Sequence, residues 1–188
     1  KMLYFIEENN IVDIKGVFGI FKANSNGDNI ELYNKDKSLA ATFNLFREQR
    51  KKNKGPYLCL SDFIAPKEIN KDDYLGGFIV TTGLKADEYV KKLEAEGDSY
   101  NAIMLKLVCD RLAEAFAEKL HEDIRKNYWG YAKDENLSMK EIFKASYRGI
   151  RPAFGYPSLI DQSQMKILFN LLNGEKVTGV KLTESYMM

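Results

Sequence analysis

A long helical pattern near the middle of the chain constrains the fold more than any other feature. From Tyr100 to about Tyr128, apolar residues recur at steps of three and four. This spacing matches the period of an amphipathic helix, and its apolar side is expected to face the core. We therefore predict one long helix here, with a core-facing stripe formed by Ile103, Met104, Leu107, Val108, Leu112, Ala115, Phe116, Leu120 and Ile124.

Strand signals come before this helix. Residues 17–23 are rich in β-branched and aromatic side chains, and residues 29–33 alternate polar and apolar, as in a half-buried strand. The polar stretch at 24–28 between them predicts a β-hairpin whose loop is longer than two residues. Residues 78–82 form a third predicted strand, and residues 40–46 fit either a strand or the start of a helix.

Shorter helical signals surround these elements. Residues 2–8 resemble the tail of a helix, and residues 87–96 form a helix with Gly97 suited to its C-terminal cap. Ser138 to Glu141 form a capping box, and Asp161 begins another helix through the same logic. Because strands come early and helices later, we predict an α+β fold rather than alternating βαβ units.

Length and charge limit the class of protein. A chain of 188 residues fits one domain, or a domain with a small extension. Its 28 basic and 27 acidic side chains nearly cancel, unlike the strongly basic surface of a nucleic-acid-binding protein. The basic run at residues 50–54 is expected to be a solvated helix end and loop. Since no apolar run reaches membrane-spanning length and no signal peptide opens the chain, we expect no membrane partner and a cytoplasmic location.

Cysteine and histidine are too few for several kinds of chemistry. Cys59 and Cys109 lie in apolar surroundings, so we expect two buried, reduced thiols. His121 is the one histidine, and its polar neighbours indicate an exposed helix face. A zinc site of the usual cysteine and histidine type lacks ligands, and a nucleophile activated by histidine would depend on His121. We therefore expect neither a metal site nor a catalytic residue in this chain.

The most chemically suggestive segment is residues 151–157, Arg-Pro-Ala-Phe-Gly-Tyr-Pro. Arg151 offers a planar fork of donors for a carboxylate, Tyr156 offers a flat ring, and Gly155 allows positive φ or close backbone approach. Two prolines stiffen the segment. It fits either a grip for a small, flat, carboxylate-bearing molecule or a rigid turn before a helix. Spacing alone favours the turn, because ligand sites are few in any protein.

Several ordered blocks resemble the activation domain of cobalamin-dependent methionine synthase. The first three are Gly-Val-Phe-Gly-Ile-Phe-Lys-Ala-Asn (16–24), Leu-Ser-Asp-Phe-Ile-Ala-Pro-Lys (60–67) and Asp-Arg-Leu-Ala-Glu-Ala-Phe-Ala-Glu (110–118). The next three are Tyr-Trp-Gly-Tyr-Ala (128–132), Gly-Ile-Arg-Pro-Ala-Phe-Gly-Tyr-Pro (149–157) and Thr-Gly-Val-Lys-Leu-Thr-Glu-Ser (178–185). Glu-Asn-Leu-Ser at 135–138 also fits the pattern. The blocks follow the order of the family and extend from about Gly16 to the C-terminus.

The resemblance implies a fold and a function. The family fold is α+β, with a twisted antiparallel sheet, a long central helix and flanking helices. In the family, the cobalamin of the synthase occasionally oxidises to inactive cob(II)alamin. The activation domain binds S-adenosylmethionine, whose methyl group, together with one electron from a flavodoxin-type protein, regenerates methylcobalamin. Cobalamin itself is held by a partner domain. The resemblance thus implies a module of a methyltransferase, and residues 1–188 are expected to form a single activation domain.

The resemblance also implies which residues bind S-adenosylmethionine. The signature Arg-x-x-x-Gly-Tyr maps onto Arg151, Gly155 and Tyr156, and the intervening backbone adds Pro152 and Ala153. On the predicted long helix, the resemblance implies that Glu114 pairs with the positive end of the ligand; the alternative is a solvated surface glutamate. Asp110 lies one turn earlier on the same helix face. It faces the ligand, contacts the cobalamin domain or is simply solvated, and the solvated interpretation is favoured. Asp62 is expected to cap a turn.

The chain also departs from the family. Phe154 replaces a proline, which is expected to loosen the loop. The flanks that supply an aspartate and a second tyrosine to the ligand are not in this sequence, so we expect either a fragment or a shortened relative. The sequence also lacks an Asp-x-His-x-x-Gly motif and a trio of cysteines, so this chain alone is not expected to make methionine. The alternative function is a docking module for a cobalamin domain or electron donor, without competent ligand binding.

Overall fold

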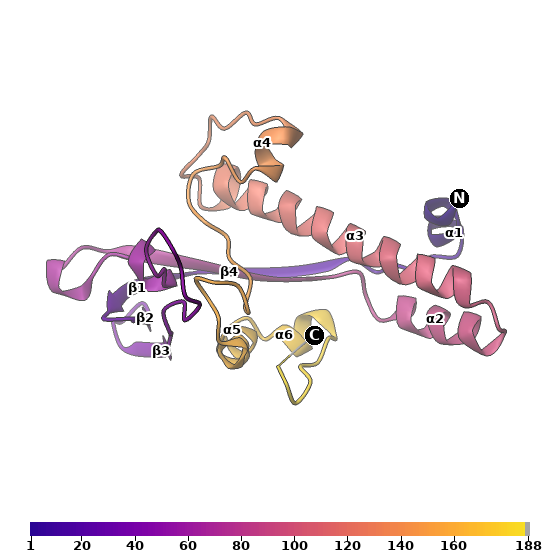
Figure 1. Cartoon of the computed structure of the whole chain (residues 1–188), viewed down its shortest axis with the longest axis horizontal. Coiled ribbons are helices and arrows are strands. Elements are labelled where there is room, and N and C mark those ends of the chain that lie inside the picture. The colour runs from indigo at the N-terminus through magenta and orange to yellow at the C-terminus, as the bar shows by residue number, and fades with distance from the viewer. Residues whose placement is uncertain (187–188) are drawn as a thin grey trace. The chain divides into compact units, whose positions relative to one another are not determined.

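A computed structural model describes residues 1–186 and has the predicted α+β fold (Figure 1). Four strands form one sheet, and a long helix lies among several shorter ones. The strands are β1 (Lys15–Asn26), β2 (Asn29–Tyr33), β3 (Leu39–Phe43) and β4 (Asp73–Thr81). The α-helices are α1 (Met2–Glu8), α2 (Lys85–Ala95), α3 (Ser99–Asp123), α4 (Met139–Phe143), α5 (Met165–Leu171) and α6 (Gly174–Thr178).

The chain divides into two compact units, and each is described by itself. The helical unit contains residues 1–17, 79–149 and 174–180. The sheet unit contains residues 18–78, 150–173 and the residues from Lys181 onward. Strands β1 and β4 therefore contribute residues to both. That the whole chain acts as a single domain stays a prediction.

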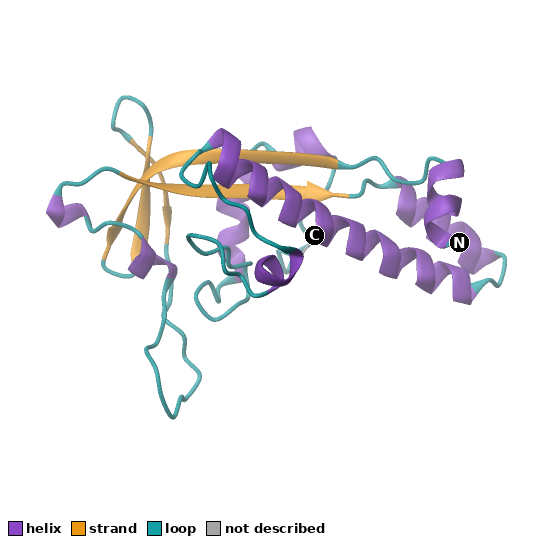
Figure 2. Cartoon of the chain, turned by 90° about the horizontal axis from the view of Figure 1, so that it is seen from above, coloured by secondary structure: helices purple, strands orange, loops and turns teal. Residues whose placement is uncertain are grey.

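The predicted hairpin is present, but its loop is shorter than expected. Strands β1 and β2 pair antiparallel, and Asn26 faces Asn29, so only Gly27 and Asp28 form the turn. Figure 2 draws the strands in orange. Gly27 has φ of 61°, and a glycine of positive φ at the first turn position suits a tight hairpin. The prediction of a longer loop was wrong because polar residues of the turn segment belong to the paired strand ends.

The other strands complete a sheet of order β3-β2-β1-β4. Strand β2 alternates between half-buried and buried residues, as its pattern predicted. Residues 39–43 are strand, which resolves the ambiguity there, and β4 begins five residues before the predicted strand. The basic run at 50–54 lies in a loop rather than at a helix end. The core of this unit consists of Ala23, Ile30, Leu32, Phe43, Leu45, Cys59, Leu60, Ile64 and Leu159.

In the helical unit, helix ends follow their sequence signals. Asp98 caps α3 by accepting a hydrogen bond from the backbone N–H of Asn101 at 3.1 Å. Gly97 follows α2 and has φ of 79°. Its N–H donates to the carbonyl of Glu94, and the N–H of Asp98 donates to the carbonyl of Leu93. This paired closure is a Schellman motif, and it confirms the predicted C-terminal cap. Helix α3 then passes directly into a π turn over Ile124–Tyr128.

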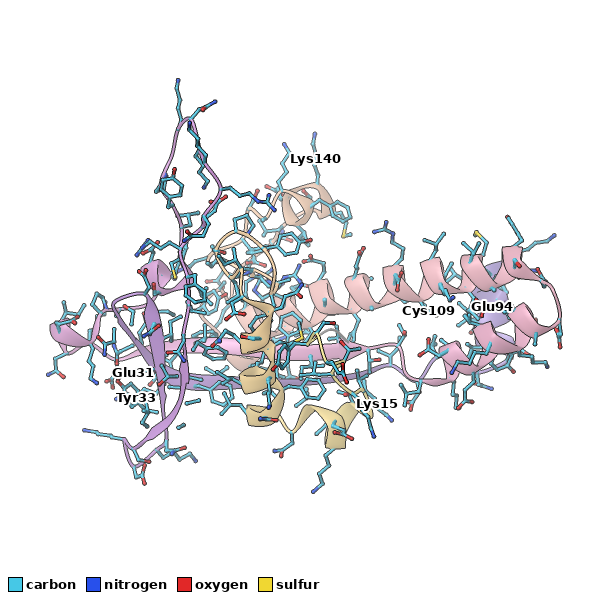
Figure 3. The ribbon with its side chains drawn as sticks, turned by 60° about the horizontal axis from the view of Figure 1, so that its bottom comes forward. Lys15, Glu31, Tyr33, Glu94, Cys109 and Lys140 are labelled. Carbon is cyan, nitrogen blue, oxygen red and sulfur yellow. The ribbon has the colours of Figure 1, made fainter. Side chains whose placement is uncertain are left out.

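The buried face of α3 differs from the predicted stripe. Ile103 and Leu107 are 58% and 52% exposed, so that part of the prediction was wrong. Helices α1 and α2 both contact α3, and their packing selects a different face. Cys109 lies on that face (Figure 3). The core of this unit consists of Ile6, Ile11, Ala86, Val90, Ala102, Leu105 and Cys109.

The two thiols and the histidine have clear environments. Cys59 and Cys109 are free and buried, as predicted. His121 is only 7% exposed, so the prediction of an exposed helix face was wrong. Its ring packs edge-on against Tyr147 at 4.8 Å between centroids, and its Nδ1 contacts Arg125. Within residues 1–186, no helix combines the length and apolar character needed to span a membrane.

Candidate ligand-binding loop

The 151–157 loop belongs to the sheet unit and lies between two capped helical segments, as predicted. On one side, the Glu141 carboxylate accepts hydrogen bonds from the Ser138 N–H at 2.8 Å and from its hydroxyl at 2.6 Å, which confirms the capping box. On the other, the Asp161 side chain accepts from the N–H of Ser163 at 2.9 Å. The two helical segments that flank the loop therefore each have an N-terminus fixed by local hydrogen bonds.

Backbone hydrogen bonds close the loop into a compact turn. The N–H of Gly155 donates to the carbonyl of Leu159 at 2.8 Å, and the N–H of Leu159 donates to the carbonyl of Tyr156 at 2.8 Å. The N–H of Tyr156 also donates to the carbonyl of Ala153 at 3.2 Å. The segment is thus a rigid turn, which is one of the two readings of the sequence and leaves the other open.

Gly155 is required by the geometry of this turn. Its φ is 90°, a left-handed value that side-chain-bearing residues rarely adopt. A Cβ at this position would also lie 3.0 Å from Nε2 of Gln162. Conformation and space therefore both favour glycine here.

The loop is anchored to the core of the sheet unit. Leu159 is buried, and Phe154 packs against the same cluster of apolar side chains. The backbone N–H of Leu60 donates to the carbonyl of Ser158 at 2.8 Å. Phe154, which we expected to loosen the loop, thus provides an apolar anchor.

Arg151 and Tyr156 project from this anchored turn in different environments. Arg151 is half-buried, and its Cζ lies 6.0 Å from the centroid of the Phe78 ring on β4. Tyr156 is 63% exposed, so its ring is accessible to a ligand. Pro152 is half-buried and Ala153 is exposed. The structure therefore brings all five predicted loop residues together on one short, ordered segment.

The two predicted acidic residues lie in the helical unit. Asp110 and Glu114 are exposed on α3, one turn apart, as their spacing predicted. Glu114 accepts a hydrogen bond from Nη1 of Arg111 at 2.5 Å, and both side chains are more than half exposed. Because these residues and the loop belong to different units, a shared ligand site stays a prediction.

Asp62 has the structural role that the sequence suggested. Its carboxylate accepts from the backbone N–H of Cys59 at 2.9 Å and from both terminal nitrogens of Arg47, at 2.8 and 2.6 Å. The Arg47 hydrogen bond is the main reason that the pKa of Asp62 lies below its ordinary value. The residue caps a turn and joins it to the preceding loop.

Sequence reasoning missed two neighbours of the loop, Phe78 and Gln162. Phe78 was assigned only to a strand, and Gln162 only to a helix start. The contact of Phe78 with Arg151 and the position of Gln162 beside Gly155 depend on tertiary structure, for which the sequence carries no local signal. Across residues 1–186, no group of three or more histidine, cysteine, aspartate or glutamate side chains is placed to hold a metal ion.

Comparisons with known proteins agree with this geometry. A family model described as "Vitamin B12 dependent methionine synthase, activation domain" matches residues 1–188. The crystal structure of the MetH reactivation domain bound to AdoHcy is 45% identical in sequence, with a TM-score of 0.91 over 98% of this chain. This chain spans 57% of the length of that one. Because the family model extends over every residue and the fold agrees at this identity, the chain belongs to the family of vitamin B12 dependent methionine synthase activation domains.

Proposed function

We propose that this chain binds S-adenosylmethionine at the 151–157 loop and presents its methyl group to cobalamin held by another domain. The observation that carries the proposal is the loop itself, where Arg151 and the exposed ring of Tyr156 project from a turn closed by Gly155. The related reactivation domain, which is bound to AdoHcy in its crystal structure, supports the choice of ligand.

The chemistry of the loop matches the parts of this ligand. The guanidinium of Arg151 can pair bidentately with the carboxylate, and such charged hydrogen bonds contribute about 1.5–3 kcal/mol. The Tyr156 ring can face the adenosine or the sulfonium cation, the latter interaction contributing roughly 0.5–2 kcal/mol.

Backbone contacts to adenine or ribose would come from Pro152 and Ala153. The N–H of Gly155 already donates to Leu159, so Gly155 acts by providing conformation and space. Proline has no backbone N–H, which leaves its carbonyl as the polar group that Pro152 can offer.

The two acidic residues of α3 would bind the positive groups of the ligand and contact the cobalamin domain. We assign Glu114 to the ammonium or sulfonium end of the ligand. Its present pair with Arg111 is exposed, and exposed pairs contribute about 0–1 kcal/mol, so a ligand cation can replace it. We assign Asp110, one turn away, to contact with the cobalamin domain.

The reaction in which this chain would take part is a methyl transfer. Cobalamin supplies the methyl-accepting cobalt, and one electron comes from a flavodoxin-type protein. The residues described here bind and orient the methyl donor, so their contribution is proximity rather than a protein nucleophile. Methionine synthesis would require those further domains.

A docking function has its own supporting observation. Ile103, Leu107, Asp110 and Glu114 recur at helical spacing on α3, and all four are exposed. Exposed apolar side chains that gather on one helix face can mark a protein-binding surface. The two carboxylates beside them can pair with basic groups of a partner. Docking to a cobalamin domain without ligand binding is therefore the second candidate function.

Calorimetric titration of the purified chain with S-adenosylmethionine separates the two candidates. We expect saturable heat with one site per chain. If a chain that is folded by circular dichroism gives no heat at millimolar ligand, the ligand-binding proposal is wrong. The docking function would then be tested by titration with an isolated cobalamin-binding domain.

A further inference from the structure

The ring of Phe78 supports the guanidinium of Arg151. The Cζ of Arg151 lies 6.0 Å from the ring centroid, within the range of a cation–π interaction. Both residues belong to the sheet unit, although they are far apart in the sequence. Phe78 is half-buried on β4, so its ring is part of the sheet and not of the loop.

Close packing beside Phe78 holds this part of β4 in place. A Cβ on the neighbouring Gly77 would lie 2.4 Å from Cδ1 of Leu168, so α5 approaches the strand where Gly77 lacks a side chain. Successive strand residues point to opposite faces, which directs Phe78 away from Leu168. The helix that follows the loop thus packs on one face, and the ring lies on the other.

An aromatic ring suits the task of presenting an arginine to a ligand. The ring attracts the guanidinium through its face and restricts its orientation, and it does so without accepting conventional hydrogen bonds from the N–H donors. Restricting the side chain before binding reduces the entropy that is lost on binding.

We propose that Phe78 is a positioning residue that orients Arg151 toward the carboxylate of the bound ligand. The inference rests on the proposed function, because it requires a ligand whose carboxylate pairs with Arg151. It also makes a statement about specificity. Phe78 should matter for ligands that carry the amino-acid carboxylate and should not matter for those that carry only the adenosine part.

The test compares two ligands by calorimetry, S-adenosylhomocysteine and 5′-methylthioadenosine, which lacks the carboxylate. We expect Phe78→Leu to weaken binding of S-adenosylhomocysteine roughly three- to tenfold. Binding of 5′-methylthioadenosine should change less than about twofold, because cation–π support acts only through Arg151. Phe78→Tyr keeps the aromatic face and should bind both ligands like the wild type.

A double-mutant cycle with Arg151→Ala separates positioning from general support of the fold. In the Arg151→Ala background, Phe78→Leu should have no further effect on S-adenosylhomocysteine. Equal losses for both ligands, additive effects in the cycle, or an unchanged affinity in Phe78→Leu would each overturn the inference. If Phe78→Leu does not fold, Phe78→Met takes its place in the same cycle, with the same expected results. Failure of the wild-type chain to bind S-adenosylhomocysteine would instead count against the proposed function.

Discussion

Arg125 donates a hydrogen bond from Nη1 to Nδ1 of His121 at 2.7 Å, inside the helical unit. A guanidinium is always charged and can only donate, so Nδ1 accepts and the imidazole is neutral, with its proton on Nε2. Glu135 balances the charge by pairing with Nε and Nη2 of Arg125 at 2.9 and 2.5 Å. The ring of Tyr147 lies 4.4 Å from Cζ. This cluster joins the end of α3 to two later segments.

Removal of Glu135 is predicted to destabilise the protein strongly. Arg125 is 1% exposed, so Glu135→Ala leaves a buried charge without its counter-ion. The expected loss in the free energy of unfolding is about 3–5 kcal/mol, measured by urea denaturation. Glu94 provides a matched control, since its pair with Lys106 is about half exposed on both sides. Similar losses for Glu135→Ala and Glu94→Ala would contradict the role of Glu135 as the counter-ion of the buried Arg125.

Stability is predicted to fall with acid through Glu31. A hydrogen bond from Asn26, followed by those from Lys67 and Tyr33, lowers the pKa of Glu31 from its ordinary 4.5 to about 2 (Figure 3). A pKa that is lower in the folded state stabilises the protein above pH 4.5, and this contribution disappears as the pH falls toward 2.

The measurement is urea denaturation as a function of pH, with Glu31→Gln beside the wild type. The variant should be less stable at neutral pH and should lose less stability between pH 4.5 and 2. Parallel pH profiles for the two proteins would show that Glu31 does not contribute to this acid sensitivity.

Gly155→Ala is predicted to reduce ligand affinity beyond its effect on stability. Gly55 is a matched control, because both glycines have φ of 90° while a Cβ on Gly55 would meet nothing within 4 Å. Backbone strain should cost both variants about 1 kcal/mol of stability. Gly155→Ala should lose somewhat more, because its Cβ would lie 3.0 Å from Nε2 of Gln162. Only Gly155→Ala should also weaken binding of S-adenosylhomocysteine. If both variants bind S-adenosylhomocysteine with equal affinity, Gly155 is not part of the binding site.

Arg151→Ala is predicted to separate binding from folding. If Arg151 pairs with the ligand carboxylate, its removal weakens binding roughly 10- to 100-fold, while the melting temperature changes little. Arg47→Ala should do the reverse, because Arg47 holds Asp28 and Asp62 together. Calorimetry and thermal unfolding of both variants test this contrast. A comparable loss of stability in Arg151→Ala would identify Arg151 as mainly a structural residue.

Elements with local signals could be predicted from the sequence, whereas buried faces could not. The alternation of β2, the glycine after α2 and the capping box at Ser138 each act within a few residues, and the structure has all three. The buried side of α3 depends on α1 and α2, so Ile103 was misplaced. His121 was misplaced for the same reason, since Tyr147 and the Arg125–Glu135 pair surround it.

The candidate site shows the same division. The loop residues were named through resemblance to a family, because their spacing alone favoured a turn. Phe78 escaped notice because a contact between a strand and a distant loop leaves no periodic pattern. Phe154 breaks the family pattern, and its packing against the core explains how this chain accommodates the change.

The π turn at the end of α3 accommodates one extra residue without changing which side chains of α3 face the core. The N–H of Trp129 bonds to the carbonyl of Ile124 at 2.8 Å, five residues back, so this turn holds one residue more than an α turn. A relative shorter by one residue here would close an ordinary turn and leave the preceding helix intact. We therefore expect a single-residue deletion to be tolerated better within residues 124–128 than earlier in α3, where it would rotate the faces of the helix by about 100°.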